Sequence, residues 1–232
     1  MKVAIMQPYF LPYIGYFQLM GQVDCFVVYD NIKYTKKGWI NRNRLLRNGQ
    51  PVTFTLPLAA GSDALDIRDR HLAPDFNRRK LLAQLTEAYR LAPQFAALKP
   101  WLEELVLFGE NRLFDYLLHS LQQVHSRLAL PCELRVSSTI DADHALRGQD
   151  RVLAICKALG ATTYINPTGG VELYEPAAFA AQGIELKFLK STLPTYPQGE
   201  HPHVPALSIL DVLAFNDLPT VQDMLSRGFV FH

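Results

Sequence analysis

The part of the chain best suited to chemistry is a cationic segment at 33–47, KYTKKGWINRNRLLR. It holds six lysines and arginines and no acidic residue. Cationic side chains at this density repel one another unless an anion neutralises them, and guanidinium groups match the oxygens of phosphates and carboxylates. The segment therefore predicts a site for an anionic ligand. The cations expected to contact that ligand are Lys36, Lys37, Arg42 and Arg44.

Neighbouring side chains would complete such a site. Trp39 offers a flat face for a ring or a sugar, and Asn41 and Asn43 offer amide hydrogen bonds. Asp30 ends the apolar run just before the segment, where it could accept a proton or orient a lysine. As catalytic residues we expect Asp30, Lys37 and Arg42, with the two cations stabilising negative charge that grows during the reaction. The plainer interpretation is a solvated basic loop with a buried tryptophan.

A second cluster, QPYFLPYIGY at 7–16, follows the first predicted strand. Gly15 and Tyr16 stand at the start of a predicted helix, where glycine lets the backbone approach a ligand and helix amides attract phosphate. The spacing of Tyr13, Gly15 and Tyr16 is similar to the His-x-Gly-His turn that binds triphosphate in nucleotidyltransferases, with tyrosines in place of both histidines. Gln7 and these three residues are expected to shape the turn around a donor. The alternative is a proline-shaped turn with tyrosines packed as a wall.

A third cluster, NPTGG at 166–170, follows a later predicted strand. Its glycine pair, Gly169 and Gly170, could form a concave nest of backbone N–H groups for an anion, and Asn166 could position an acceptor. A plain turn is the alternative. No metal-binding residues are expected, because His119 and His125 are spaced six apart and do not share one helix face.

Strand-like and helix-like segments alternate along the chain, which is typical of α/β proteins. KVAIMQP at 2–8 and DCFVVYD at 24–30 flank the helix-like IGYFQLMGQ at 14–22, which predicts a βαβ unit with parallel strands. Further strands are expected in PVTFTLPL, ELRVSSTI, TTYINP and IELKFLK. The predicted fold is α/β, with a parallel or mixed sheet and helices on both faces, Rossmann-like or nucleotidyltransferase-like. Because ligands of such sheets bind beyond the carboxyl ends of the strands, the three clusters are expected to line one cleft.

The middle of the chain, residues 75–130, has helical apolar spacing and is expected to be a helical insertion. Pro93 and Pro100 should separate its first helix from a shorter one, because proline clashes with the preceding turn. SILDVLAF and TVQDMLSRG predict two closing helices. We expect a single α/β domain over residues 1–232 with the helical segment at about 75–130.

Composition restricts the classes of partner. Apolar residues make up 49% and charged residues 19%, as in ordinary globular proteins, and a net charge of +1 gives no overall attraction to nucleic acid. No apolar run approaches the length of a membrane span, so no membrane insertion is expected. Three widely spaced cysteines and the lack of a leader-like N-terminus predict a cytoplasmic protein with reduced thiols.

Several segments together make the sequence similar to the WbqC-like protein family. They are IMQPYFLPYIGYFQLM, VYDNIKYTKKGWINRNRL, YRLAPQF, ICKALGATTYINPTGG and the closing YPQ and LSILDVL. The resemblance covers nearly the whole chain and implies a bacterial protein with a role near polysaccharide or O-antigen biosynthesis. The chain departs from the family in TLPLAAG, where alanines replace an expected basic residue, and at Lys80, where a histidine is usual. If those positions contact the substrate, the departures imply a different substrate or altered activity.

Two functions follow from these features. The first is a cytoplasmic transferase that moves a nucleotidyl or an acyl/aminoacyl group onto a sugar or amine. The donor would be a sugar nucleotide, a nucleotide or an acyl donor, and a nucleoside triphosphate with Mg²⁺ is one option for a cofactor. The second is a binding or assembly protein that recognises an anionic sugar nucleotide without chemistry. A protein whose tyrosines form an interface is a third option, and a homo-oligomer is compatible with all three.

Overall fold

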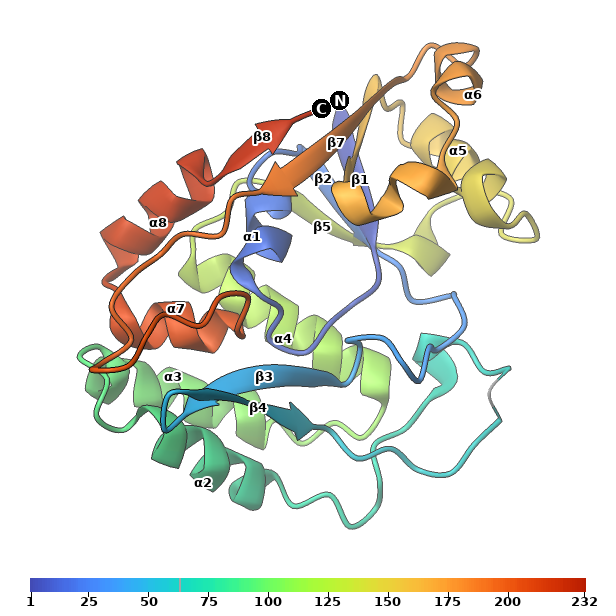
Figure 1. Ribbon diagram of the computed structural model, residues 1–232. Helices are drawn as coiled ribbons and strands as arrows, with labels where there is room; N and C mark the ends of the chain where they lie inside the picture. Colours follow the sequence, from blue (N-terminus) through green and yellow to red (C-terminus); the bar gives the residue numbers. More distant parts are fainter. Residues whose placement is uncertain (63) are drawn as a thin grey trace.

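A six-stranded sheet forms the centre of the computed structural model, which describes residues 1–62 and 64–232 (Figure 1). The strand order is β5-β2-β1-β6-β7-β8. The strands are β1 (Lys2–Met6), β2 (Cys25–Val28), β5 (Glu133–Val136), β6 (Thr163–Pro167), β7 (Glu185–Ser191) and β8 (Phe229–Phe231). All neighbouring pairs are parallel except β7 and β8. The predicted α/β fold with a mixed sheet is confirmed.

The first unit of the sheet is the predicted βαβ crossover. Strand β1 pairs in parallel with β2, with Val3 opposite Cys25, and helix α1 (Ile14–Met20) connects the two strands. Alternate residues of β1 face opposite sides of the sheet and both sets are buried, since Val3 and Ala4 are each 0% exposed. A strand buried on both faces requires helices on both faces.

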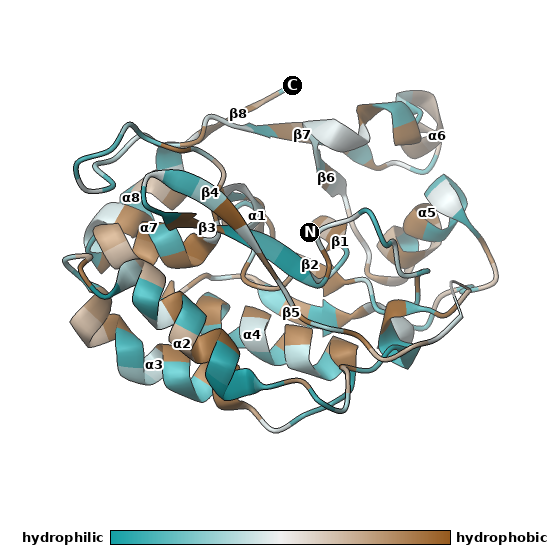
Figure 2. Ribbon diagram, turned by 60° about the horizontal axis from the view of Figure 1, so that its bottom comes forward, coloured by the Kyte–Doolittle hydropathy of each residue, from teal (hydrophilic) through white to brown (hydrophobic). Residues whose placement is uncertain are grey.

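Helices cover both faces of the sheet, as predicted. One apolar cluster joins one face to α1, α4 (Leu113–Arg127), α7 (Ile209–Phe215) and α8 (Leu218–Arg227). A second cluster joins the other face to α5 (Gly148–Ala158) and α6 (Pro176–Ala180). Figure 2 shows apolar and polar residues alternating around α4 and α5, as expected for helices that bury one side.

A separate antiparallel hairpin contains part of the cationic segment. Strands β3 (Arg42–Arg47) and β4 (Gln50–Thr55) pair only with each other in the described part of the chain, and they lie below the main sheet in Figure 1. The strand expected in PVTFTLPL is therefore present as β4, but it belongs to this hairpin and not to the main sheet. The plainer interpretation of the cationic segment as a loop does not hold for Arg42–Arg47. Asn48 and Gly49 form the turn with φ of 51° and 71°, the backbone that an Asn-Gly hairpin turn requires.

The predicted helical middle of the chain is confirmed. It contains α2 (Arg78–Tyr89), α3 (Phe95–Leu107) and α4. Pro93 lies between α2 and α3, as predicted, but Pro100 lies inside α3 and does not end it. Buried Leu98 and Leu102 flank Pro100, so packing of this face against the core outweighs the missing backbone hydrogen bond.

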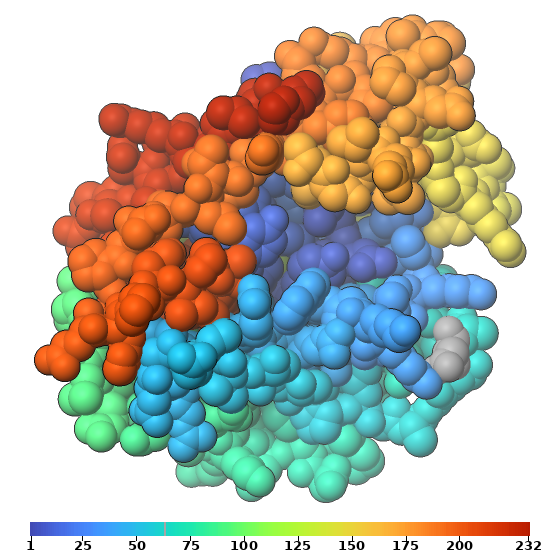
Figure 3. Space-filling model, in the orientation of Figure 1, coloured from blue at the N-terminus to red at the C-terminus, as the bar shows by residue number. Residues whose placement is uncertain are grey.

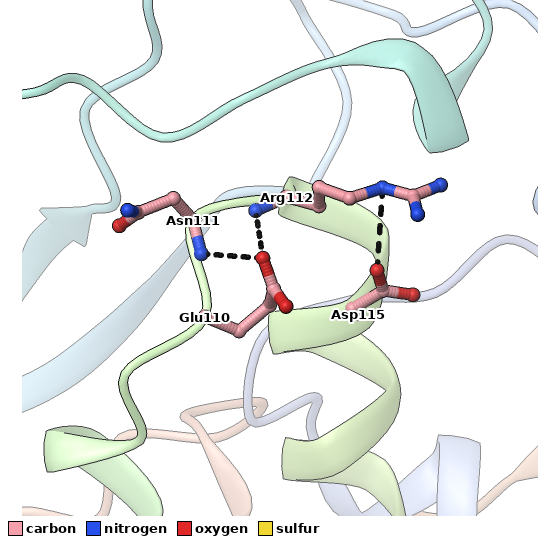
Figure 4. Close-up of polar contacts among 4 residues, drawn as sticks. All are labelled: Glu110, Asn111, Arg112 and Asp115. Carbon is pink, nitrogen blue, oxygen red and sulfur yellow. Dashed lines mark hydrogen bonds and ion pairs between the residues drawn. The ribbon is translucent and has the colours of Figure 1, made fainter.

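The turn that starts α4 is held by a carboxylate (Figure 4). Glu110 Oε1 accepts the backbone N–H of Asn111 at 2.7 Å and that of Arg112 at 2.8 Å. Arg112 Nε lies 3.3 Å from the Asp115 carboxylate in the first turn of the helix. The N–H groups of Arg112 and Asn111 lower the pKa of the Glu110 carboxyl below its ordinary value.

Replacing Glu110 with glutamine is expected to reduce stability at neutral pH by less than about 1 kcal/mol, because the carboxylate lies near the surface, where solvent weakens its bonds to the two N–H groups. A lowered pKa means that this stabilisation is present above the unfolded pKa and disappears as the pH falls through the folded pKa. The melting temperatures of wild type and E110Q should therefore differ at pH 7, and the difference should shrink as the pH is lowered from 7 to 3. A constant difference across this range, or a similar loss in the exposed α3 control E104Q, would contradict the assignment.

Two further properties concern the whole chain. Among the described residues, no helix is long and apolar enough to cross a membrane. The three cysteines are unpaired and buried. Burial raises the pKa of Cys25 to about 11 and those of Cys132 and Cys156 to about 12, so these thiols stay protonated near neutral pH and are poor nucleophiles.

Candidate functional site

A pocket of about 160 Å³ lies between the early turn, strand β3 and the segment that precedes α7. Its lining residues are Tyr9, Pro12, Tyr13, Trp39, Asn43, Arg44 and Ala206. Figure 3 shows a hollow whose floor is formed by dark-blue N-terminal residues, with blue residues of the β3 region below it and orange C-terminal residues beside it. The first two predicted clusters thus meet at one pocket.

The early turn is fastened to β3 by an asparagine. Asn43 is 6% exposed, and its Nδ2 donates to the Leu11 carbonyl at 2.6 Å and to the Phe10 carbonyl at 3.2 Å. Leu11 has φ of 45°, and its carbonyl also accepts from Ser208 Oγ at 2.8 Å. The Asn43 amide group therefore holds the unusual backbone that carries Tyr9 and Tyr13.

Gly15 makes room for a side chain. A Cβ atom at Gly15 would lie 2.3 Å from the nearest ring atom of Tyr13, which is too close for any real contact. The glycine thus lets the Tyr13 ring fold back over α1 and line the pocket. Tyr16 is 2% exposed and donates its hydroxyl to the Gln7 carbonyl at 2.9 Å, so it packs in the core beneath the turn.

Trp39, which lines the pocket, contacts two arginines of the same segment. The guanidinium carbons of Arg42 and Arg44 lie 5.6 and 5.5 Å from the Trp39 ring centre, within the range of cation–π contacts. Trp39 is 42% exposed, so the plainer interpretation with a buried tryptophan does not describe it. A ring that is stacked on cations and open to solvent can receive a planar or sugar ligand.

The two arginines are used differently. Arg42 donates from Nε to the Gly38 carbonyl at 2.8 Å and from an Nη to the Lys37 carbonyl at 2.6 Å, which shapes the turn before β3. Arg44 donates an Nη to the Ala206 carbonyl at 3.0 Å, and its Nε is buried without a hydrogen-bond partner among the described residues. Arg44 is the cation that lines the pocket.

Three further residues of the cationic segment, Lys36, Lys37 and Asn41, were also expected to contact the ligand. Lys36 and Lys37 are exposed and are not among the described residues that line the pocket. Asn41 accepts the Tyr34 hydroxyl at 2.8 Å and donates to the Leu56 carbonyl at 2.7 Å. Its amide thus links the segment to the residue that follows β4 and has little capacity left for a ligand.

Asp30 lies at the carboxyl end of β2, away from the pocket lining. It is 2% exposed, and its two oxygens accept the backbone N–H and the hydroxyl of Ser138, at 2.9 and 2.6 Å. These bonds join the end of β2 to the end of β5. Next to it, Asn31 contacts Ser137 and His144. The role of Asp30 as a proton acceptor stays a prediction, and any such role requires its hydrogen bonds with Ser138 to change.

The third cluster lies at the carboxyl end of β6, beside that of β1, but it does not line the described pocket. Asn166 donates to the Tyr164 hydroxyl at 2.8 Å, and a Cβ atom at Gly170 would lie 2.2 Å from Asn166 Oδ1. The glycine thus accommodates the Asn166 side chain. Gly169 is exposed. Light-orange residues of the 165–180 region border the upper side of the hollow in Figure 3.

Sequence reasoning did not select three of the lining residues. Tyr9 lies in the first cluster, but nothing in the sequence distinguishes it from the aromatic residues of that cluster that pack in the core. Pro12 was interpreted only as turn chemistry. Ala206 carries no chemical signal in the sequence, since it contributes a backbone carbonyl from a segment more than 160 residues away from β3.

The pocket offers hydrogen-bond donors, a cation and aromatic faces. Burial raises the pKa of the Tyr9 and Tyr13 hydroxyls, so both stay protonated and can donate at neutral pH. Among the described residues that line the pocket, none carries a carboxylate or an imidazole. This set suits recognition of a ring that bears an anionic group.

Comparison with known proteins agrees with the motifs in the sequence. The model of the WbqC-like protein family matches residues 7–222. The chain is also 27% identical over 215 residues to the uncharacterized protein Rv1507c of Mycobacterium tuberculosis (strain ATCC 25618 / H37Rv), a match that covers 91% of this chain and 92% of that protein. The family match includes the early turn, the cationic segment and the diglycine turn. The chain therefore belongs to the WbqC-like protein family.

Proposed function

We propose that the pocket binds a small anionic ligand through its ring or sugar, and that the protein transfers a nucleotidyl or acyl group onto a sugar or amine. The observation that carries the proposal is the Trp39 ring stacked against Arg44 at a pocket that two tyrosines line. Such a set neutralises an anion and orients a ring at the same time. The biological setting we infer is cytoplasmic polysaccharide or O-antigen-type biosynthesis, as the family resemblance suggests.

Each part of the site has a role in this proposal. Arg44 faces the ligand, while Arg42, which contacts Trp39, and the nearby Lys37 attract the anion and stabilise charge that grows on the donor. Tyr9 and Tyr13 donate to ligand oxygens. Acyl or nucleotidyl transfer depends strongly on positioning and charge stabilisation, so a pocket built from cations and hydroxyls suits it.

A thermal-shift screen tests the binding step. We expect UDP-glucose, ATP with Mg²⁺ or acetyl-coenzyme A to raise the melting temperature, with the responding compound identifying the donor class. A ligand at 100 times its Kd stabilises the native state by about 2.7 kcal/mol, or about 5–10 °C for a domain of this size. Glucose and acetate serve as controls without a phosphate-bearing donor group. If no phosphorylated compound shifts the transition, the proposal is wrong.

A second function, binding without chemistry, is favoured by one specific observation. The pocket lining holds no carboxylate or imidazole among its described residues, and both oxygens of Asp30 contact Ser138. A binding protein needs donors and a stacking face, whereas an enzyme of this kind needs a proton acceptor near the reacting atom. Turnover of the responding donor with a panel of sugar and amine acceptors separates the two functions. Turnover that D30N abolishes without loss of binding would favour the transferase, and binding without turnover would favour the alternative.

A further inference from the structure

The segment 192–207, which connects β7 to α7, forms one wall of the pocket. Ala206 has φ of 55°, lines the pocket and accepts the Arg44 guanidinium N–H through its carbonyl at 3.0 Å. Leu193, at the other end of the segment, has φ of 42°. Non-glycine residues adopt this left-handed backbone only when their surroundings hold them there. The position of Ala206 thus requires contacts that fix the segment.

Those contacts converge on one buried carboxylate. Asp211, in the first turn of α7, is 0% exposed. Its Oδ1 accepts the Tyr196 hydroxyl at 2.7 Å and the Gln198 amide Nε2 at 2.7 Å. Both donors belong to segment 192–207, so a single oxygen atom ties two of its residues to the helix.

Gln198 passes this restraint along the segment. Its Oε1 accepts the Val204 N–H at 2.7 Å, and its Nε2 donates to the Val204 carbonyl at 3.1 Å. Val204 stands two residues before Ala206. His203 adds a contact between its Nδ1 and the Tyr196 carbonyl at 3.2 Å. The amide of Gln198 therefore closes the loop 198–204 and fixes the backbone two residues before Ala206.

Burying the Asp211 carboxylate costs desolvation free energy, which an apolar side chain at this position would not. Burial raises the pKa of Asp211, while the hydroxyl of Tyr196 and the amide of Gln198 oppose that rise. The Tyr89 hydroxyl lies beside the same carboxyl group and accepts the Leu46 N–H of β3 at 3.2 Å. An apolar side chain would avoid the desolvation but would leave the phenol and the amide without an acceptor.

We propose that Asp211 is a positioning residue of the pocket, which acts through Tyr196 and Gln198 to place the Ala206 carbonyl against Arg44. This proposal rests on the pocket of the proposed function and adds a residue that does not touch the ligand. It predicts that the acceptor oxygen of Asp211 matters and its negative charge does not. Asparagine keeps that oxygen, whereas leucine removes it at similar volume.

Trp39 allows the proposal to be tested without a ligand. The chain has two tryptophans, and in W101F the fluorescence comes from Trp39 alone, which lines the pocket with Arg44 and Ala206. We would measure the Trp39 emission maximum and its quenching by acrylamide in the W101F chain and in the W101F chain with D211L, Q198L or D211N. I155A, which removes buried volume from the cluster on the opposite face of the sheet, controls for a general loss of melting temperature.

We expect D211L and Q198L to shift the emission to longer wavelength and to increase quenching, because Ala206 leaves Arg44 and opens one side of the pocket. D211N should match the W101F parent, and I155A should lower the melting temperature without changing Trp39. Unchanged Trp39 signals in folded D211L and Q198L, or a change in D211N equal to that in D211L, would overturn the proposal. Because the measurement uses no ligand, its result does not depend on whether a ligand is found in the thermal-shift screen.

Discussion

Replacing Arg44 with alanine is expected to remove most of the affinity for a phosphorylated ligand while the chain stays folded. Arg44 lines the pocket, stacks on Trp39 and has a buried Nε without a partner among the described residues. A hydrogen bond to a charged group contributes about 1.5–3 kcal/mol, which corresponds to a loss of about 10- to 100-fold in affinity. The measurement is a titration of wild type and R44A with the compound that responds in the thermal-shift screen.

Arg47 provides the matched control for this substitution. It lies on the same strand, is exposed and is not among the pocket-lining residues. R47A removes the same charge and should retain affinity within a small factor, since exposed charges outside the site act only through the screened field. Equal losses in R44A and R47A would indicate general attraction to a basic surface and would contradict a specific role for Arg44.

The second large effect is expected from Gly15→Ala. The new Cβ atom would meet the outer atoms of the Tyr13 ring at 2.3–2.9 Å, so one of the two groups must move. Overpacking costs about 1–3 kcal/mol, but here the clash involves the far end of a half-buried side chain, and alanine gains up to about 1 kcal/mol over glycine in a helix. The Tyr13 ring should therefore swing away, with a small change in stability and a large loss of ligand affinity.

A double-mutant cycle separates this mechanism from general damage. If G15A acts by displacing Tyr13, then Y13A and the double variant Y13A/G15A should bind the ligand equally weakly, because the ring is lost in both. Additive losses would mean that Gly15 affects the pocket by another route, such as close approach of a ligand to its backbone. The measurement is the ligand affinity of the four chains, together with their melting temperatures.

The sequence predicted the sheet because local and long-range signals agree there. Val3, Ile5 and the residues of β2 form short apolar runs on either side of a helix that ends near Gly21, a pattern that leaves few alternatives to a parallel βαβ unit. Because parallel strands end at one edge, the first two clusters could be expected to meet. They share the pocket that Tyr13 and Trp39 line.

The use of individual side chains was harder to predict. Asn41 and Asn43 looked like ligand donors, yet their amides bond to backbone carbonyls of Leu56 and of the early turn. Gly15 and Gly170 looked like places for a ligand, yet each leaves room for a side chain of its own chain, Tyr13 and Asn166. A sequence shows which groups can donate or accept, but the partner that satisfies each group is set by packing between distant segments.

The hairpin and segment 192–207 were also hard to predict from the sequence. Strand β3 carries Arg42, Arg44 and Arg47, and this charge density favoured a solvated loop over the strand that leads into the Asn-Gly turn of the hairpin. The role of segment 192–207 depends on Asp211, an acidic residue inside an apolar helix pattern. Its hydroxyl and amide partners precede it by 13 to 15 residues, which no helix or strand periodicity relates.

Fluorescence of Trp39 in the W101F chain, titrated with UDP-glucose, ATP with Mg²⁺ and acetyl-coenzyme A, tests the pocket most directly. The compound that raises the melting temperature should change Trp39 emission in a saturable way, with one dissociation constant for both signals, and R44A should weaken both together. A compound that stabilises the protein while Trp39 emission stays constant would place the ligand elsewhere and would contradict the account.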